Sequence, residues 1–323
     1  HHPLIDKLMN WEQQDGLPYV VHYQASEGEK DFGTWYLENE KRIEEKLKQH
    51  GAVLFKQCGI ETINDFNGIL DRITEELKPY IDGFSPRSKL QSNIYTSTEY
   101  DKSHYITLHN ELSYSSNWPS KLFFCCIIPS ATGGETAISD CRKVLDSIPE
   151  HIVSEFREKG VRYIRNIHSG GGGGPSWQET FETQDKKEVE VFCDANDIEY
   201  EWRSGGMLRL IQNRSSIIQH PITSEEVWFN QVDQFHPSHL PEEIYETLMM
   251  LNNNVAEDLP MYGCFGDGSD IPAEYLTTIR NVADSKRVTN KWDQGDLLMV
   301  DNILTSHGRM PYTGDRQILV AME

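Results

Sequence analysis

The sequence lacks an apolar run of the roughly 20 residues that a membrane-spanning helix requires. It also begins without the charged, apolar and small-residue succession of a secretory signal. Basic side chains are scarce, because 30 lysines and arginines stand against 51 aspartates and glutamates, a formal net charge of −21. A field of this sign repels phosphate groups, so we expect neither a nucleic-acid partner nor docking on an anionic membrane.

Cysteines are few, and their spacing follows no metal-binding pattern. None of the six forms a Cys-x-x-Cys pair, and Cys125 and Cys126 lie inside an apolar run. Such cysteines are more often small buried hydrophobes than zinc ligands or disulfide partners, which favours a reducing, cytoplasmic location. The sequence also contains no repeat and no linker rich in proline or serine, so we expect a single domain over residues 1–323.

The N-terminal part alternates helix and strand patterns. Amphipathic helices are expected at about 34–50 and from a Thr62 cap to Pro79, because apolar residues recur there at helical spacing. The short apolar segment 52–55 between them is typical of a buried strand.

Sheet-forming segments occupy two separated parts of the sequence, about 89–140 and about 292–323. Their β-branched and aromatic runs are broken by turn residues and lie too close together for parallel crossovers. Between them, about 141–290 carries mainly helical patterns, at 149–159, 185–195, 241–251 and 272–282, with one strand-like segment at 227–230. We therefore expect a mainly β fold with flanking helices (α+β), whose strands from both ends form one sheet system around a large helical insert.

His109-Asn110-Glu111 is the first candidate for chemistry. On a strand, residues two apart point to the same face, so His109 and Glu111 could chelate one metal ion. The pair alone is weak evidence, because 12 histidines and 51 acidic residues predict about two such matches by chance. Taken alone, it is better explained by a structural histidine beside a solvated glutamate.

A second group of residues follows near the end of the sequence, where His307 precedes Arg309 and Arg316. Two histidines and one carboxylate with open coordination positions are typical of non-haem Fe(II) oxygenases. A 2-oxo acid such as 2-oxoglutarate can chelate that ion and leave a position for O₂. Its far carboxylate then requires a cationic fork, which Arg316 would supply, with the hydroxyl of Thr136 as a second donor.

Together, the His-x-Glu motif, the Gly-Gly-Glu-Thr segment at 133–136 and the His-Gly-Arg segment with Arg316 resemble the TauD/TfdA (taurine dioxygenase) superfamily of Fe(II)/2-oxoglutarate-dependent dioxygenases. The likeness runs from about Tyr95 to Met322. It implies a double-stranded β-helix (jelly-roll) core and the cofactors Fe(II), 2-oxoglutarate and O₂. By the same likeness, the iron ligands would be His109, Glu111 and His307. The residues that bind 2-oxoglutarate would be Arg316 and Thr136.

One position departs from the commoner pattern of that superfamily. Most members have aspartate where this sequence has Glu111, whereas the clavaminate-synthase-like branch has glutamate. A halogenating relative would require a small residue there, so we do not expect halogenation.

Further runs, at 109–114, 118–125, 176–181 and 227–231, are similar to SyrP-like hydroxylases found beside non-ribosomal peptide synthetases. That similarity implies hydroxylation of an unactivated C–H in secondary metabolism, with release of succinate and CO₂. It also implies a small amino-acid-like substrate, free or tethered to a carrier protein.

Residues that contact the substrate are less well defined by the sequence. The likeness places Asn230 and Gln231 near the pocket, and Arg209 and Arg309 are cations able to meet a substrate carboxylate. Structural hydrogen bonds or ion pairs explain these four at least as well. The five glycines at 170–174 favour a mobile lid and a tolerated surface loop about equally.

Other outcomes and other classes of protein remain open at this point. With the same cofactors, desaturation, cyclisation or epimerisation can replace hydroxylation. A zinc hydrolase would use the histidines and the glutamate but would give Arg316 and Thr136 no role. A non-catalytic jelly-roll binding protein would have no need of all five residues. The sequence does not indicate the oligomeric state.

Overall fold

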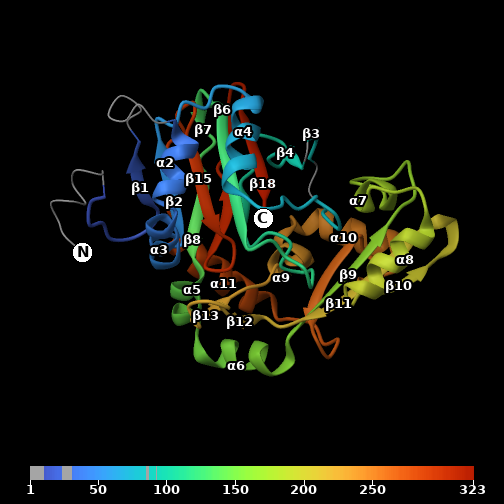
Figure 1. The fold of residues 1–323 in the computed structure, drawn as a ribbon. Coiled ribbons are helices and arrows are strands. Elements are labelled where there is room, and N and C mark those ends of the chain that lie inside the picture. The colour runs from blue at the N-terminus through green and yellow to red at the C-terminus, as the bar shows by residue number, and fades with distance from the viewer. Residues whose placement is uncertain (1–10, 24–30, 85–86, 92) are drawn as a thin grey trace.

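The computed structural model describes residues 11–23, 31–84, 87–91 and 93–323, and its centre is a jelly-roll of two sheets (Figure 1). Within these residues, the larger sheet has seven strands in the order β1 (Tyr19–His22), β2 (Ala52–Lys56), β15 (Leu297–Asp301), β6 (Lys121–Ile128), β18 (Gln317–Met322), β4 (Ile94–Thr96) and β3 (Lys89–Gln91). The smaller sheet has the order β5 (Ile106–His109), β16 (Thr305–Arg309) and β8 (Thr136–Asp140), and β7 (Thr132–Gly133) pairs with β17 (Tyr312–Thr313).

Strand β6 shows why the sequence forms this core. Phe124 enters the cluster that also contains Ile138 of β8, whereas Phe123 and Cys125 enter the cluster under the N-terminal helices. Because both faces of the strand are buried, its sequence is apolar throughout instead of alternating. β15 and β18 pair with its two edges, which confirms that strands from both ends of the sequence form one sheet system.

The N-terminal helices cover the outer face of the larger sheet. The helix expected at 34–50 is two helices, α2 (Phe32–Glu38) and α3 (Glu40–His50), because Asn39 leaves helical geometry and caps the first helix through Trp35 O. Helix α4 (Ile63–Ile73) starts at the predicted Thr62 cap but ends before Pro79, since Thr74 is already extended.

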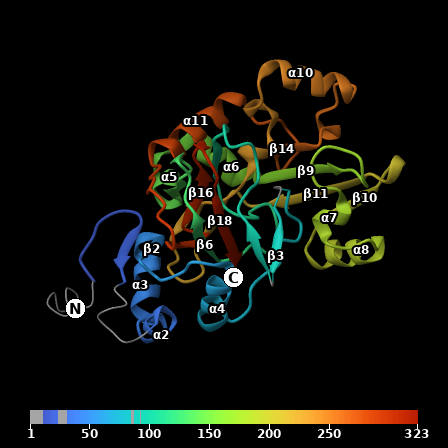
Figure 2. The same ribbon diagram turned by 90° about the horizontal axis from the view of Figure 1, so that it is seen from above.

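The region between the two halves of the jelly-roll is less helical than expected. It contains α5 (Cys141–Ser147), α6 (Glu150–Lys159), α7 (Trp177–Phe181), α8 (Lys186–Ala195), α9 (Val232–Phe235), α10 (Glu242–Leu251) and α11 (Ala273–Ser285). It also forms a separate antiparallel sheet, β10 (Glu199–Trp202), β11 (Leu208–Arg214), β9 (Val161–Ile167) and β14 (Met261–Phe265), and a hairpin of β12 (Ile217–Gln219) and β13 (Glu226–Trp228). Figure 2 shows this sheet on the side away from the N-terminal helices. The helical prediction missed the sheet because arginine and other polar residues interrupt the apolar alternation of β9 and β11. No helix in the described ranges is long and apolar enough to cross a membrane.

A buried ion pair joins this second sheet to the segment before β3. Arg165 Nη1 of β9 lies 2.7 Å from Asp82 Oδ1, and both side chains are almost completely buried. Gln212 Nε2 of β11 donates to the other carboxylate oxygen. Burial raises the pKa of Asp82, and the adjacent guanidinium opposes that rise. The pair therefore anchors the segment at 80–84, which leads directly to the site described below.

Arg165→Leu is expected to lower the free energy of unfolding by about 3–5 kcal/mol, because it leaves a buried carboxylate without its counter-ion. Chemical denaturation measures this loss. The control is Arg157→Leu, which breaks an exposed pair with Glu226 and should cost no more than about 1 kcal/mol. Equal losses for the two variants would contradict a structural role for the buried pair.

Candidate active site

Strand register brings together two histidines that lie far apart in the sequence. His109 at the end of β5 and His307 in β16 are direct partners across the antiparallel pair, and their ring centroids lie 4.4 Å apart. Gly308 permits the close approach of the two strands, since a Cβ there would lie 2.3 Å from the carbonyl oxygen of Ile106. Side chains of such opposed residues stand on the same face of the sheet.

Glu111 completes the cluster from a turn that follows β5. The strand ends at His109, and Leu112 adopts a positive φ of 55°. The amide side chain of Asn302 holds this turn, because it accepts from Glu111 N and donates to Glu111 O. Ligand atoms of His109, Glu111 and His307 all lie within 4.8 Å of one another. The His-x-Glu spacing therefore predicted two side chains that do lie together, although a turn, and not a continuous strand, directs the Glu111 carboxylate toward the histidines.

Asn302→Ala is expected to destabilise the fold by about 2–4 kcal/mol, because it leaves several buried backbone groups without partners. It should also weaken metal binding about 10- to 100-fold, since groups that orient ligands typically contribute that much. Thermal unfolding and metal titration measure the two effects. Asn213→Ala, which removes a partner of Arg162 at an exposed position, is the control. Unchanged metal affinity in Asn302→Ala would contradict this positioning role.

The protonation state of His109 suits a metal ligand. Its Nδ1–H donates to Thr107 O at 2.8 Å, which leaves the lone pair of Nε2 for a cation. Burial, followed by the charge of His307, lowers the pKa of His109 to about 4. His307 Nδ1 is buried without a hydrogen-bond partner among the described residues, and its Nε2 lies 3.4 Å from Glu111 Oε1. Two imidazoles and a carboxylate form a donor set that fits Fe(II).

Arg87 is a site residue that the sequence did not reveal. Its Nη2 lies 2.6 Å from Glu111 Oε1, and both side chains are almost completely buried. Burial alone would raise the pKa of Glu111, but Arg87 and then His307 hold it well below its usual value. No spacing rule connects an arginine to a carboxylate 24 residues away, so only the fold shows this contact.

The metal cluster opens into a cavity that suits an organic anion. Arg316 and Thr136 line this cavity together with both histidines. Arg316 donates to Gly134 O and to Ser97 Oγ, and no carboxylate of the described residues lies within ion-pair distance of it. Burial, followed by repulsion from Arg309, lowers the pKa of Arg316 to about 10. A partly buried cation for which the described residues supply no carboxylate is a natural partner for a carboxylate ligand.

The hydroxyl group of Thr136 can donate a hydrogen bond into the same cavity. Its hydroxyl oxygen accepts from the indole Nε1–H of Trp292 at 3.1 Å, so its own proton remains for another acceptor. Trp292 is buried in the core, and it also orients this hydroxyl. Gly134, which precedes Glu135, is also important for the position of Arg316. Its φ is +75°, and a Cβ added there would lie 3.2 Å from Arg316 Cδ.

Two of the four candidate substrate residues are arginines, and both have structural partners. Arg309 lines the anion cavity, but its guanidinium donates to four backbone carbonyls between Thr98 and His104. It therefore supports the segment that precedes β5. The structure does not bring Arg209 to the metal cluster, because β11 belongs to the second sheet, where Arg209 pairs with Asp258 and Asn166.

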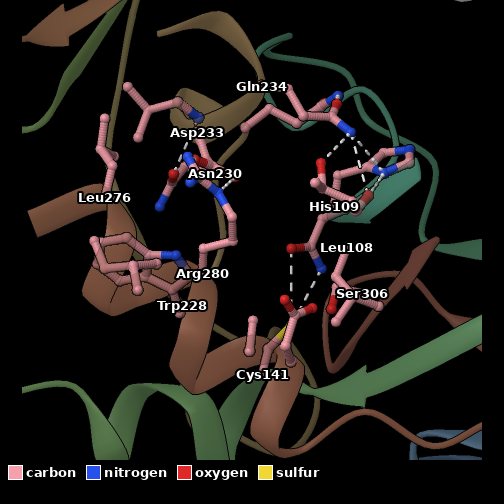
Figure 3. A pocket seen from close by; sticks show the side chains of 17 residues that line it. Leu108, His109, Cys141, Trp228, Asn230, Asp233, Gln234, Leu276, Arg280 and Ser306 are labelled. Carbon is pink, nitrogen blue, oxygen red and sulfur yellow. Dashed lines mark hydrogen bonds and ion pairs between the residues drawn. The ribbon is translucent and has the colours of Figure 1, made fainter. Parts of the chain in front are cut away.

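Asn230 and Gln231 line a different, small cavity on the Nδ1 side of His109 (Figure 3). Asn230 donates to Ser216 O, and Gln231 accepts from the backbone and hydroxyl of Ser113. Gln231 also donates to Gln234, whose amide lies 3.1 Å from His109 Nδ1. The hydrogen bonds of both side chains are thus structural, and they support the ligand strand from behind.

The glycine run lies at the rim of a second, wider cavity. Residues 170–173 are exposed, and Gly174 and Pro175 belong to the cavity wall. His168 organises the run, because its Nδ1 accepts from Gly170 N and its Nε2–H donates to Gly174 O. A lid role for this segment remains a prediction.

Comparison with known proteins agrees with the site. The sequence matches the family of taurine catabolism dioxygenases, TauD/TfdA, over residues 16–322. The chain belongs to this family. It is 36% identical over 308 residues to the dapdiamide synthesis protein DdaC of Enterobacter agglomerans, covering 95% of this chain and 92% of DdaC. A clavaminate synthase-like protein of Arabidopsis thaliana is 26% identical over 290 residues, or 87% of this chain and 83% of that protein.

Solved structures show the same fold at low identity. PvcB from Pseudomonas aeruginosa has a TM-score of 0.53 at 12% identity, covering 94% of this chain and 85% of PvcB. AAD-2, solved with Mn(II) and N-oxalylglycine, has a TM-score of 0.54 at 12% identity, covering 96% and 95%. The family resemblance and the jelly-roll expected from the motifs are confirmed, and the protein is a TauD/TfdA-family dioxygenase.

Proposed function

We propose that this dioxygenase uses Fe(II), 2-oxoglutarate and O₂ to hydroxylate an unactivated C–H of an amino acid or amino-acid-derived molecule, with release of succinate and CO₂. One observation carries the proposal: His109 and His307, which cluster with Glu111, line one cavity together with Arg316 and Thr136. A metal site without an oxidative role would give Arg316 and Thr136 no function in binding a cosubstrate.

The residues of the site would have three roles: they hold the metal ion, orient 2-oxoglutarate and exclude water. His109, Glu111 and His307 would hold Fe(II) on one face, and Fe(II) with 2-oxoglutarate and O₂ would supply the oxidising power for the C–H bond, O₂ being the oxidant. Arg316 and Thr136 would fix the far carboxylate of 2-oxoglutarate, so that its direction relative to the three ligands is constant. Phe124, whose ring lies 5.1 Å from that of His307, and Ile106 give the cavity apolar walls that exclude water.

An amino-acid-derived substrate is supported by the relatives and by the shape of the site. DdaC is a protein of dapdiamide synthesis, and a biosynthetic role of the same kind is proposed here. The wider cavity beside the glycine run has a volume of about 770 Å³, which accommodates a small molecule. Desaturation, cyclisation or epimerisation, and a carrier-tethered substrate, are alternative outcomes with the same machinery.

The test begins without oxygen. Adding Fe(II) and 2-oxoglutarate to the folded protein should produce a visible metal-to-ligand charge-transfer band. Absence of the band from the folded protein would overturn the proposed function. With O₂, succinate release is then measured for free amino acids and for the same amino acids on carrier proteins, and mass spectrometry of the product distinguishes a gain of one oxygen from a loss of two hydrogens.

A further inference from the structure

The wider cavity and the metal cavity share one side chain. Tyr80, Phe84, Tyr95, Gly174 and Pro175 are among the residues that line the wider cavity. Among the described residues, Arg87 is the one that lines both this cavity and the cavity of the metal cluster. Arg87 therefore belongs to the walls of both cavities, and it contacts the metal cluster through Glu111.

The hydrogen bonds of Arg87 are incomplete. Its Nη2 donates to Glu111, and its guanidinium lies over the ring of Tyr80 at 4.4 Å. Nε and Nη1, in contrast, are buried and have no acceptor among the described residues. A guanidinium that is closed off from water with unmet N–H groups is costly, and an incoming anion relieves that cost. Only 2% of the side chain is exposed.

The charged residues that line the two cavities determine which ligand fits beside the guanidinium of Arg87. Arg316 and Thr136 also line the metal cavity, and they are already proposed to bind the far carboxylate of 2-oxoglutarate. The wider cavity is lined by Glu99, Glu179 and Glu182, and its cation Lys89 pairs with Glu182. The two remaining carboxylates disfavour a simple anion and favour a molecule that also has a cationic group. A carboxylate beside an ammonium group is the chemistry of an amino acid.

We propose that Arg87 binds a free carboxylate of the substrate at the junction of the two cavities. The proposal rests on the proposed function, and it narrows the substrate to amino-acid derivatives whose carboxylate is ionised. Neutral acyl derivatives, including esters and carrier thioesters formed through that same carboxylate, leave the unmet N–H groups of Arg87 without an anion. They are therefore expected to bind less well.

The experiment separates substrate binding from assembly of the metal site. Wild-type protein, Arg87→Gln and Arg87→Lys are loaded anaerobically with Fe(II) and 2-oxoglutarate, and the charge-transfer band is recorded. Free L-amino acids and their N-acetyl derivatives are then titrated beside the matched methyl esters, and perturbation of the band reports binding. Lys89→Gln is the matched control, because Lys89 is a second cation of the same cavity that is half exposed and pairs with Glu182.

We expect acids to bind to the wild type at least about tenfold more tightly than their esters, as the loss of a charge-assisted contact predicts. Arg87→Gln should lose this preference while its band is weakened, and not abolished, by loss of the contact with Glu111. Arg87→Lys should keep part of the preference, and Lys89→Gln should retain it in full. Three results would overturn the inference: no acid of the panel perturbs the wild-type band, acids and esters bind equally, or Arg87→Gln loses the band itself, which would assign Arg87 to the metal or to 2-oxoglutarate. Failure of the proposed function is distinct, since the wild type would then show no band at all.

Discussion

Replacing His307 by alanine should abolish the Fe(II)–2-oxoglutarate charge-transfer band and reduce 2-oxoglutarate-dependent succinate release by more than about 100-fold. The reason is geometric. His307 and His109 are opposed on neighbouring strands, and removal of either imidazole leaves only two protein donors on that face. Loss of a group that merely orients a ligand already costs about 10- to 100-fold, so loss of a ligand should cost more.

Band intensity under anaerobic conditions and metal content after desalting measure this effect. His151→Ala is the control, because this exposed histidine of α6 contacts Tyr275 and lies outside the cluster. Its band and its rate should equal those of the wild type. A His307→Ala protein that retains stoichiometric iron would show that the cluster is not the metal site.

Replacing Arg316 by methionine should weaken 2-oxoglutarate binding by about 2–4 kcal/mol, or about 30- to 1000-fold, while iron binding is kept. Methionine retains much of the apolar stem of arginine but removes the cation, which no carboxylate of the described residues offsets. Equilibrium titration of the band with 2-oxoglutarate gives the dissociation constant, and metal content is measured separately.

Arg316→Lys separates charge from shape at the same position. Lysine keeps the positive charge but not the planar fork, so an intermediate affinity is expected. Thr136→Val, which removes the second donor, should give a smaller loss than Arg316→Met. If Arg316→Met loses iron but still binds 2-oxoglutarate, the roles assigned to the two groups of residues are reversed.

The candidate metal and cosubstrate residues could be predicted because each demands a particular chemical group. Imidazole, carboxylate and guanidinium have few substitutes in their roles, so the residue types themselves mark the candidate positions. His109, Glu111, His307, Arg316 and Thr136 accordingly meet in one place. Their assignment as ligands and as cosubstrate-binding residues awaits the experiments above.

The remaining features were outside the reach of sequence patterns. Arg87 contacts Glu111 across a loop, and Asn302 holds the turn of Glu111 from another part of the chain. The second sheet was not predicted, because its strands mix arginine with apolar residues. Long-range pairing, and not local propensity, stabilises such strands. The same limit explains Arg209, a plausible cation in sequence that faces Asp258 in the fold.

The sequence by itself determined the family, the buried strands of the jelly-roll and the small set of residues able to carry oxidative chemistry. Composition, apolar runs and residue type are local properties, and they are visible without coordinates. Only the tertiary structure decided which ring nitrogen of His109 is available to a metal ion, which charges keep Glu111 ionised and which side chain lines both cavities. These depend on strand register and on contacts between distant segments, because burial and neighbouring charges, not residue identity, determine protonation and access.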